Sequence, residues 1–391
     1  MSEWIEYKVA DLGRVLTGKT PKTSNREYYD GIIPFITPSD DMTVKYIYHT
    51  SKTLTEEGAQ SVKNSIIPAG TICVSCIGSD LGKVVITTER SVTNQQINSI
   101  IVDESKFNLD FVYYVMTMLG KLMNHHSKTS TAVPIVNKSQ FSDYSFMCPD
   151  IEQQSKIGSM LAALDKKIET NNKINRNLSE QAKALFEEEL LKFDSVPEGW
   201  KKGSLSDIAD YLNGLAMQKF RPGDDEKGLP VLKIKELRQG SCDANSELCS
   251  LNIKPEYIIH DGDVIFSWSG SLLVDFWCGG ECGLNQHLFK VTSKKYDKWF
   301  YYAWTLYHLD RFIAVAADKA TTMGHIKREE LSKAEVLIPD SDSYKRIGEV
   351  LGPLYDMIIS NRVENRRLAT LRDELLPMLM SGEMDVSEVE L

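Results

Sequence analysis

The sequence predicts an α+β protein built from two tandem mixed strand/helix domains, each followed by a long helix, with the two helices pairing as an antiparallel coiled coil. Three observations lead to this prediction. The chain has 391 residues, more than one hydrophobic core usually supports. Landmarks of the first half recur in order in the second half. Each half also ends in a segment whose apolar residues repeat every seven positions, which is typical of paired helices.

The internal duplication is visible in a series of matching short motifs. Trp4 opens a segment reading W-x-x-x-x-V-A-D-L-G, and Trp200 opens W-x-x-G-S-L-S-D-I-A. Further pairs follow in the same order: Ile67-Pro68-Ala69-Gly70 with Ile259-His260-Asp261-Gly262, Asn94-Gln95 with Asn285-Gln286, Tyr113-Tyr114 with Tyr301-Tyr302, and Asn175-Arg176 with Asn365-Arg366. A shared order of this kind is the signature of a repeat architecture. The halves are therefore predicted to have the same fold.

The first part of each half has the composition of a mixed domain, over 1–150 and 197–340. Short segments rich in Ile and Val, bounded by Gly, Pro and Asn, are expected to be strands. They cover 31–37, 64–77, 84–87 and 97–102, and then 229–235, 257–268 and 288–292. Helical spacing of aromatic and aliphatic residues predicts one helix near 109–124 and its copy near 298–313.

A heptad pattern follows each domain, predicting long helices over 151–196 and 341–391, the second ending in an acidic C-terminal tail. Its expected seam residues are Ile157, Leu161, Leu164, Ile168, Asn171, Asn175 and Leu178, and Ile347, Leu351, Leu354, Ile358, Asn361, Asn365 and Leu368, continuing to Leu371, Leu375 and Leu379. Asparagine interrupts both copies at the same two places, and polar seam residues fix register and orientation. A single amphipathic helix packed on a globular core is the alternative interpretation.

The composition restricts the class of protein. The formal net charge of -10 argues against a generally basic nucleic-acid coat protein, although it leaves room for local basic patches. Seven cysteines, an odd number with irregular spacing, favour a reducing compartment over a disulfide framework. No apolar run reaches the roughly 18 residues of a membrane span, and the N-terminus lacks the features of a secretory signal. We therefore expect a cytoplasmic protein without membrane contact.

One weak pattern suggests an enzyme. Asp150 after a proline, followed by Asp165 and Lys167, matches the loose arrangement of metal-dependent nucleases, in which carboxylates hold Mg²⁺. The duplication argues against it, because the second copy keeps Asp340 but has Tyr355 and no matching lysine. Asp165 and Lys167 also lie on the heptad helix, where solvated charges are expected.

Metal and cofactor sites are not predicted either. Cys73 and Cys76 have zinc-like spacing, but they lie in a predicted strand, where positions three apart face opposite sides. Cys278, Cys282 and His287 lack an evident fourth ligand. The sequence has no P-loop, no dinucleotide fingerprint and no Asn-Pro-Pro-Tyr segment of the kind that holds a flipped adenine. A protein without catalysis, metal or cofactor is expected.

Basic and polar loops at matching places in the two domains are the candidate DNA-binding surface. Glycine and proline allow close backbone approach, lysine and arginine neutralise phosphates, and Asn, Gln and Arg can pair with base edges. The candidates are Lys19, Lys22, Arg26, Lys128, Asn137 and Lys138, and then Lys219, Arg221, Lys233, Lys235, Lys319, His325 and Lys327. For each, a solvated surface loop is the alternative. Asn94-Gln95 and Asn285-Gln286 either contact DNA or cap a turn.

In order and duplication, these motifs resemble the specificity (S) subunit of type I restriction–modification systems, over essentially the whole chain. The matching residues include Trp4, Gly18-Lys19-Thr20-Pro21, Ile33-Pro34-Phe35-Ile36, Gln153-Gln154-x-Lys156-Ile157, Pro197-Glu198-Gly199-Trp200 and Leu379-Met380-Ser381-Gly382-Glu383. The second domain departs from the pattern by lacking Thr-Pro after Gly214, and Tyr355 replaces the aspartate of Leu164-Asp165.

The resemblance implies a non-catalytic, sequence-specific DNA-binding subunit. Each domain would be a target recognition domain reading one half-site of a bipartite double-stranded DNA target, and the paired helices would set the gap. Two methyltransferase (modification) subunits would supply S-adenosylmethionine and adenine methylation, and restriction/motor subunits can join them. The helices would also be the docking surface for these partners. The alternative function is a coiled-coil protein-interaction scaffold that does not read DNA.

Overall fold

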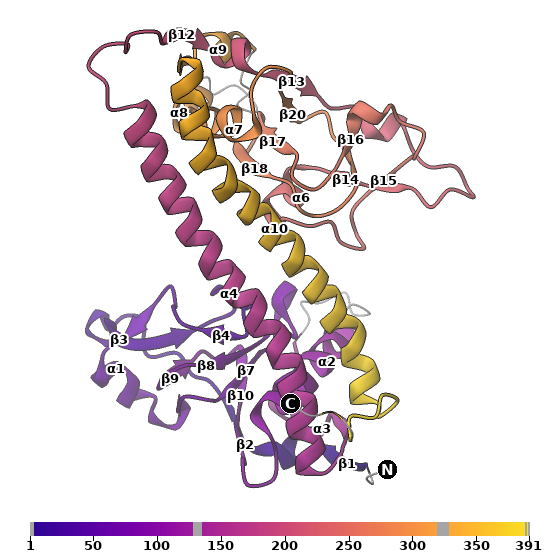
Figure 1. Ribbon diagram of the computed structural model, residues 1–391. Coiled ribbons are helices and arrows are strands. Elements are labelled where there is room, and N and C mark those ends of the chain that lie inside the picture. The colour runs from indigo at the N-terminus through magenta and orange to yellow at the C-terminus, as the bar shows by residue number, and fades with distance from the viewer. Residues whose placement is uncertain (1–3, 128–134, 319–327, 388, 390–391) are drawn as a thin grey trace. The chain divides into compact units, whose positions relative to one another are not determined.

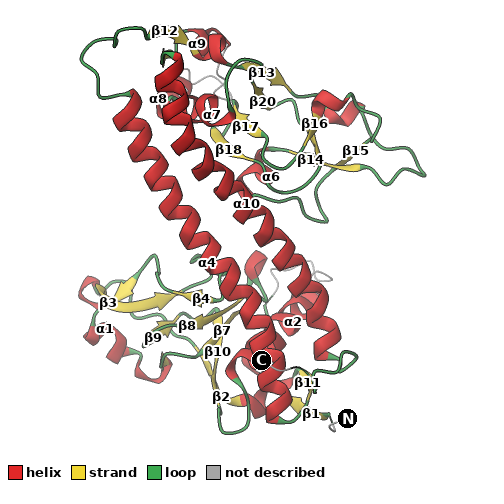
Figure 2. Cartoon of the chain, in the orientation of Figure 1, coloured by secondary structure: helices red, strands yellow, loops and turns green. Residues whose placement is uncertain are grey.

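The computed structural model describes residues 4–127, 135–318, 328–387 and 389 (Figure 1). The chain divides into two compact units, one comprising Met1–Lys166 and Ala369–Leu391 and the other Lys167–Leu368. Both contain sheets and helices (Figure 2). Within the described residues, no helix is long and apolar enough to cross a membrane.

The described part of the first unit contains three sheets. The five-stranded sheet has the order β2 (Gly13–Thr17), β10 (Ile97–Val102), β7 (Ile72–Ser75), β8 (Val84–Thr87) and β4 (Tyr46–Ile47). The four-stranded sheet has the order β5 (Thr53–Leu54), β3 (Tyr29–Ile36), β9 (Ser91–Thr93) and β6 (Ile66–Ile67), and β1 (Ile5–Lys8) pairs with β11 (Ser145–Cys148). The α-helices outside the long helices are α1 (Glu56–Ser61), α2 (Leu109–Ser127) and α3 (Lys138–Asp143).

The second unit repeats this topology strand for strand, except that its described residues contain no counterpart of β4. One sheet has the order β13 (Asp210–Asn213), β20 (Leu288–Thr292), β17 (Val264–Ser267) and β18 (Leu273–Phe276). Another has the order β15 (Leu248–Cys249), β14 (Leu229–Leu232), β19 (Cys282–Leu284) and β16 (Ile258–Ile259), and β12 (Lys201–Ser204) pairs with β21 (Glu335–Ile338). The shorter helices are α5 (Leu205–Ile208), α6 (Ile234–Gln239), α7 (Lys298–Tyr307), α8 (Leu309–Asp318) and α9 (Arg328–Ser332). The duplication predicted from motifs is therefore a duplication of fold.

Several predicted elements are shorter than expected, for local reasons. The strand predicted over 229–235 ends at Leu232, because Glu236 accepts a hydrogen bond from the Lys233 amide and starts α6. The predicted strands 64–77 and 257–268 are each split at a glycine with positive φ, Gly70 (76°) and Gly262 (83°). The helix predicted over 298–313 divides at His308 into α7 and α8.

The two long helices, α4 (Ile151–Leu190) and α10 (Ser341–Met380), have 40 residues each. They begin in the same way: Asp150 Oδ1 accepts from the Gln153 amide at 2.9 Å, and Asp340 Oδ1 accepts from the Ser343 amide at 2.9 Å. Such caps satisfy amides that have no partner inside the helix. Helix α4 ends at Leu190, before the predicted limit of 196, and α10 ends at Met380, within the range 341–391 that was predicted to hold a helix and an acidic tail.

Within the second unit, α4 and α10 pair antiparallel through their asparagines. Asn171 Nδ2 donates to Asn365 Oδ1 at 2.9 Å, and Asn361 Nδ2 donates to Asn175 Oδ1 at 2.8 Å. Asn171 and Asn175 are buried. A shift of register would leave these buried amides unpaired, so the two cross-helix pairs specify both direction and register.

Within the first unit, the same two helices pair through apolar residues and one ion pair. Ile157 and Leu161 of α4 belong to one buried cluster with Leu376 and Leu379 of α10. Arg372 Nη1 lies 2.6 Å from Asp165 Oδ1, and both side chains are largely buried. The prediction that Leu371 lies at the seam is wrong, because this residue is 44% exposed while its neighbour Arg372 faces inward.

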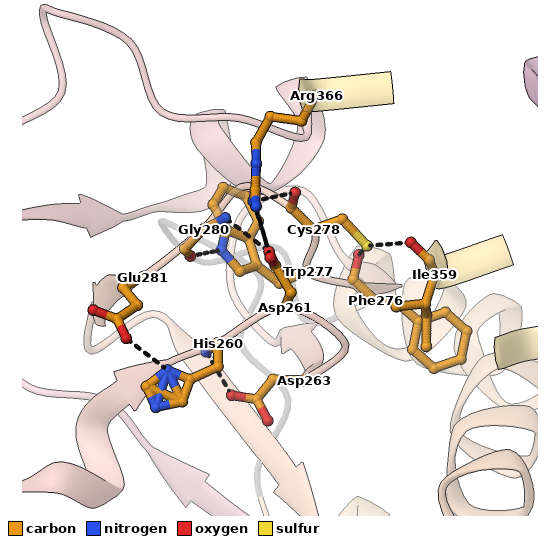
Figure 3. A network of polar contacts seen from close by, with 10 residues as sticks. All are labelled: His260, Asp261, Asp263, Phe276, Trp277, Cys278, Gly280, Glu281, Ile359 and Arg366. Atoms are coloured by element: carbon orange, nitrogen blue, oxygen red, sulfur yellow. Dashed lines mark hydrogen bonds and ion pairs between the residues drawn. The ribbon is translucent and has the colours of Figure 1, made fainter. Parts of the chain in front are cut away.

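In the second unit, α10 is fixed to the domain by two arginines, of which Figure 3 shows Arg366. Arg366 binds both carboxylate oxygens of Asp261 at 2.7 Å and also donates to the Cys278 carbonyl at 2.6 Å. Arg362 Nη1 lies 2.6 Å from Asp275 Oδ1. Burial opposes ionisation of Asp261, but the hydrogen bonds from Arg366 and the Gly280 amide outweigh it and lower its pKa. These contacts therefore attach the helix firmly to the domain within this unit.

A glycine in each long helix allows close contact with its own domain. A Cβ on Gly158 would lie 2.6 Å from Asn108 Oδ1 and 2.9 Å from the Phe111 amide nitrogen. A Cβ on Gly348 would lie 2.9 Å from the Trp299 ring nitrogen. The two glycines occupy equivalent places in the repeat, so both helices are seated on their domains in the same way.

The segment after α10 is packed, although the sequence predicted only an acidic tail. Val386 is 2% exposed within the buried cluster of the first unit, and Lys156 Nζ donates to the Ser387 carbonyl at 2.8 Å. Val386→Ser should lower the free energy of unfolding by about 2 kcal/mol, because buried apolar area is lost. Thermal or urea unfolding measures this. Ser387→Ala is the control, since it keeps the backbone acceptor, and equal stability of both variants would contradict the packing role.

Candidate nucleic-acid interface

In the first unit, the candidate loop 18–26 is attached to the turn between β9 and β10. The Gly18 amide donates to the Ile97 carbonyl at 3.1 Å, and the Lys19 amide donates to the Thr93 carbonyl at 2.9 Å. A Cβ on Gly18 would lie 2.1 Å from the Asn94 carbonyl oxygen. Only glycine fits at this close approach of the loop to the turn.

The second unit attaches its loop 214–221 to the turn between β19 and β20 by the same bonds. The Gly214 amide donates to the Leu288 carbonyl at 3.0 Å, and the Leu215 amide donates to the Leu284 carbonyl at 2.9 Å. A Cβ on Gly214 would lie 2.2 Å from the Asn285 carbonyl oxygen. The geometry of loop and turn is thus retained, while most side chains on the loops differ.

The asparagine of each turn has a structural role. Asn94 Oδ1 accepts from the Gln96 amide at 3.0 Å, and Asn285 Oδ1 accepts from the His287 amide at 3.2 Å. Both asparagines are buried. Of the two interpretations that the sequence left open, turn capping therefore applies to Asn94 and Asn285. The glutamine that follows each of them takes no part in the cap.

The predicted DNA-binding residues of the first unit that the structure describes are exposed, on loops or at the start of short helices. Lys19, Lys22 and Arg26 are exposed, and among the described residues none of them has an ion-pair partner. Lys138 is exposed on the first turn of α3, and Asn137 caps that helix, its Oδ1 accepting from the Gln140 amide at 3.0 Å. Lys128 lies outside the described residues.

In the second unit, two of the predicted cations form ion pairs with acidic residues. Lys219 and Arg221 are exposed. Lys233 pairs with Glu247 at 2.7 Å, and Lys235 pairs with Asp243 at 3.2 Å. The remaining predicted residues, Lys319, His325 and Lys327, lie outside the described residues. Contacts between DNA and Lys233 or Lys235 would have to replace these ion pairs.

An aromatic and histidine cluster that the sequence did not predict lies beside the second loop. Trp268 Nε1 donates to Asn213 Oδ1 at 3.0 Å, and the Trp268 ring stacks on Phe289 at 5.5 Å between centroids. Ser269 Oγ and His287 Nδ1 lie 3.0 Å apart. The residues come from the end of β13, the turn after β17 and the segment around the start of β20, so no local spacing in the sequence could reveal the cluster.

The nuclease constellation is not assembled. Asp150 caps α4, Asp165 accepts from Arg372 and from the Tyr114 hydroxyl, and Lys167 Nζ lies 3.3 Å from Glu364 Oε2. In the described residues no group of three or more His, Cys, Asp or Glu side chains could hold a metal ion. Cys73 and Cys76 are free and buried, and burial raises the pKa of their thiols to about 12 and about 11. They are packing residues.

The geometry defines a class of protein: two copies of one mixed domain, each presenting a loop on a turn and each packed against both of two paired helices. The type I restriction modification DNA specificity domain matches residues 1–180 and again 197–369. The chain therefore belongs to the family of type I restriction–modification DNA specificity proteins. As a member it is a specificity subunit, a DNA-recognising component without catalysis of its own.

Individual relatives agree with this assignment. The chain is 26% identical over 422 residues to the type I restriction enzyme MjaIX specificity subunit of Methanocaldococcus jannaschii, covering 99% of this chain and 95% of that protein. It is 34% identical over 179 residues to the HindI specificity subunit of Haemophilus influenzae, covering 45% and 39%. The crystal structure of an S subunit from M. genitalium has the same fold, with a TM-score of 0.54, 14% identity, and coverage of 97% and 96%.

Proposed function

We propose that each unit reads one half-site of a bipartite double-stranded DNA target and that the paired helices set the gap. One observation carries this proposal: the same loop-on-turn geometry occurs in both units, with exposed cations on loops whose side chains differ. Phosphate contacts position a protein on DNA, and side chains at base edges specify sequence. Equal backbone geometry with unequal side chains supports two similarly docked but unlike half-sites.

The partners follow from the same proposal. The chain would assemble with two methyltransferase subunits, which bind S-adenosylmethionine and transfer its methyl group, and restriction/motor subunits would join for cleavage. The complex would act on DNA in the cytoplasm. Lys19, Lys22 and Arg26 in the first unit, with Lys138, and Lys219 and Arg221 in the second, would contact phosphates. The comparisons give no support to a scaffold that does not read DNA.

Replacing Lys19, Lys22 and Arg26 together by glutamine should weaken DNA binding equally for all sequences. Each lost phosphate contact lowers the slope of log K against log salt by about 0.9, so a reduction of up to about 2.7 is expected. Titration of labelled duplex at several salt concentrations measures it. The matched control is Lys52, Lys63 and Lys121 to glutamine, which removes three exposed charges elsewhere in this unit that also have no ion-pair partner among the described residues. An equal effect of both triples would contradict the assigned loop.

A further inference from the structure

The glutamine in each turn, Gln95 and Gln286, has no structural explanation of the kind found for its neighbours. Gly18 and Gly214 are required because a side chain would collide with a carbonyl oxygen. Asn94 and Asn285 cap the turns. The duplicated loops have otherwise diverged, for example Lys19-Thr20 against Leu215-Ala216 and Gln96 against His287. A glutamine retained at the same turn therefore points to a contact that both units share.

In the first unit, the Gln95 side chain is exposed and oriented by the candidate loop. Its Oε1 accepts a hydrogen bond from the Thr20 hydroxyl at 2.6 Å. Among the described residues, no partner is recorded for its Nε2 group. The amide is therefore attached to the loop that carries Lys19 and Lys22, with its two N–H donors unused. This places a group capable of reading a base beside groups that bind phosphates.

In the second unit, Gln286 is half-buried and incompletely hydrogen-bonded. Its Oε1 is buried without a hydrogen-bond partner in the described part of the chain, and its Nε2 lies 3.4 Å from His287 Nε2. A buried acceptor without a partner costs free energy that a ligand donor can recover. Rotating this amide outward would break no hydrogen bond to its oxygen. Turning toward DNA would therefore give the Gln286 oxygen a hydrogen bond that it lacks within the described part of the chain.

We propose that Gln95 and Gln286 are equivalent base-reading residues, each pairing with an adenine in its own half-site. Glutamine donates to N7 and accepts from the N6 amino group of adenine, a paired contact at the major-groove edge. This inference rests on the proposed function and adds to it: the two half-sites differ elsewhere, but each contains an adenine read by the same type of side chain. The differing neighbours, Gln96 and His287, lie beside the reading residue in each unit.

The test compares Gln95→Glu and Gln286→Glu with the wild-type chain, each co-expressed with its methyltransferase partner, by selection from random duplex DNA. Glutamate has the same shape but lacks the donor for N7, and it accepts from the amino group of cytosine. Gln95→Glu should reduce the preference for adenine about 10-fold to 100-fold at one position of one half-site and shift it toward cytosine. Gln286→Glu should do the same only in the other half-site. Gln239→Glu, an exposed glutamine on α6, is the matched control and should leave both unchanged.

The possible results distinguish a failure of the proposed function from a failure of the inference about the two glutamines. If the wild-type chain enriches no bipartite sequence, the proposed function falls. If it enriches two half-sites and neither glutamate variant alters them, the inference about glutamine is overturned while the proposed function stands. A uniform loss of affinity without a change of preferred base also overturns the inference, since it would mean that the residue supports the fold or a phosphate contact.

Discussion

Exchanging residues 1–150 for the corresponding domain of another specificity subunit should replace one half-site completely and leave the other unchanged. The expectation follows from the structure of each unit. The loop, the turn and the strands that position them all belong to one domain, and the junction at Asp150 lies at the cap of α4 rather than within the helix. Because specific binding exceeds nonspecific binding by about 10³-fold to 10⁷-fold, the hybrid should lose its former target.

This exchange is measured by selecting DNA with the hybrid and wild-type chains in parallel. Residues 383–391 should be transferred with the domain, because Val386 and the Ser387 carbonyl pack against the first unit. The reciprocal exchange of 197–340 is the control and should alter the other half-site. If either hybrid changed both half-sites, the two domains could not be independent readers.

Lengthening both long helices by one heptad should widen the gap between half-sites by about three base pairs. Seven residues add about 10.5 Å of helix, and one base pair occupies about 3.4 Å along DNA. Insertions after Ile168 in α4 and after Arg367 in α10 keep the cross-helix asparagine pairs. They also keep the Arg366–Asp261 and Arg372–Asp165 ion pairs that hold each unit together. A seven-residue insertion preserves the heptad phase of the seam.

The half-site sequences themselves should not change in this variant, and only their separation should. A single insertion in α4 alone is the informative control, because it puts the asparagine pairs out of register and should destabilise the protein instead. The double insertion contradicts the spacer role if it folds, binds DNA and retains the original gap.

Much of the fold could be predicted from the sequence because the duplication gives every signal twice. The order of motifs located both domains, and the asparagines at two matching seam positions favoured paired helices, while the family resemblance implied that the helices pair antiparallel. The predictions were wrong at positions where a neighbouring residue forms a hydrogen bond or ion pair that changes the local structure. Helix α6 replaces part of a predicted strand, where the Glu236 side chain accepts from the Lys233 amide and the Leu237 amide donates to the Lys233 carbonyl. Leu371 fits the heptad, yet the ion pair of Arg372 with Asp165 turns it outward.

The candidate site could be predicted only in part, because its parts come from distant segments. The basic loops were evident from their composition, but their attachment to the Asn-Gln turns required the register of the sheets. Spacing alone could not separate the structural asparagine from the available glutamine, since both are polar and adjacent. Nor could it show that Lys233 and Lys235 are paired with Glu247 and Asp243, which lie on other segments of the same domain.

Selection from random duplex DNA, using the chain co-expressed with its methyltransferase partner, tests the central claim most directly. We expect two unlike short half-sites separated by a fixed gap of unspecified sequence, with binding that weakens steeply as salt rises. Recovery of one continuous sequence would contradict the division of reading between two domains. Failure to enrich any sequence, with binding absent or indifferent to salt, would contradict DNA recognition by this chain.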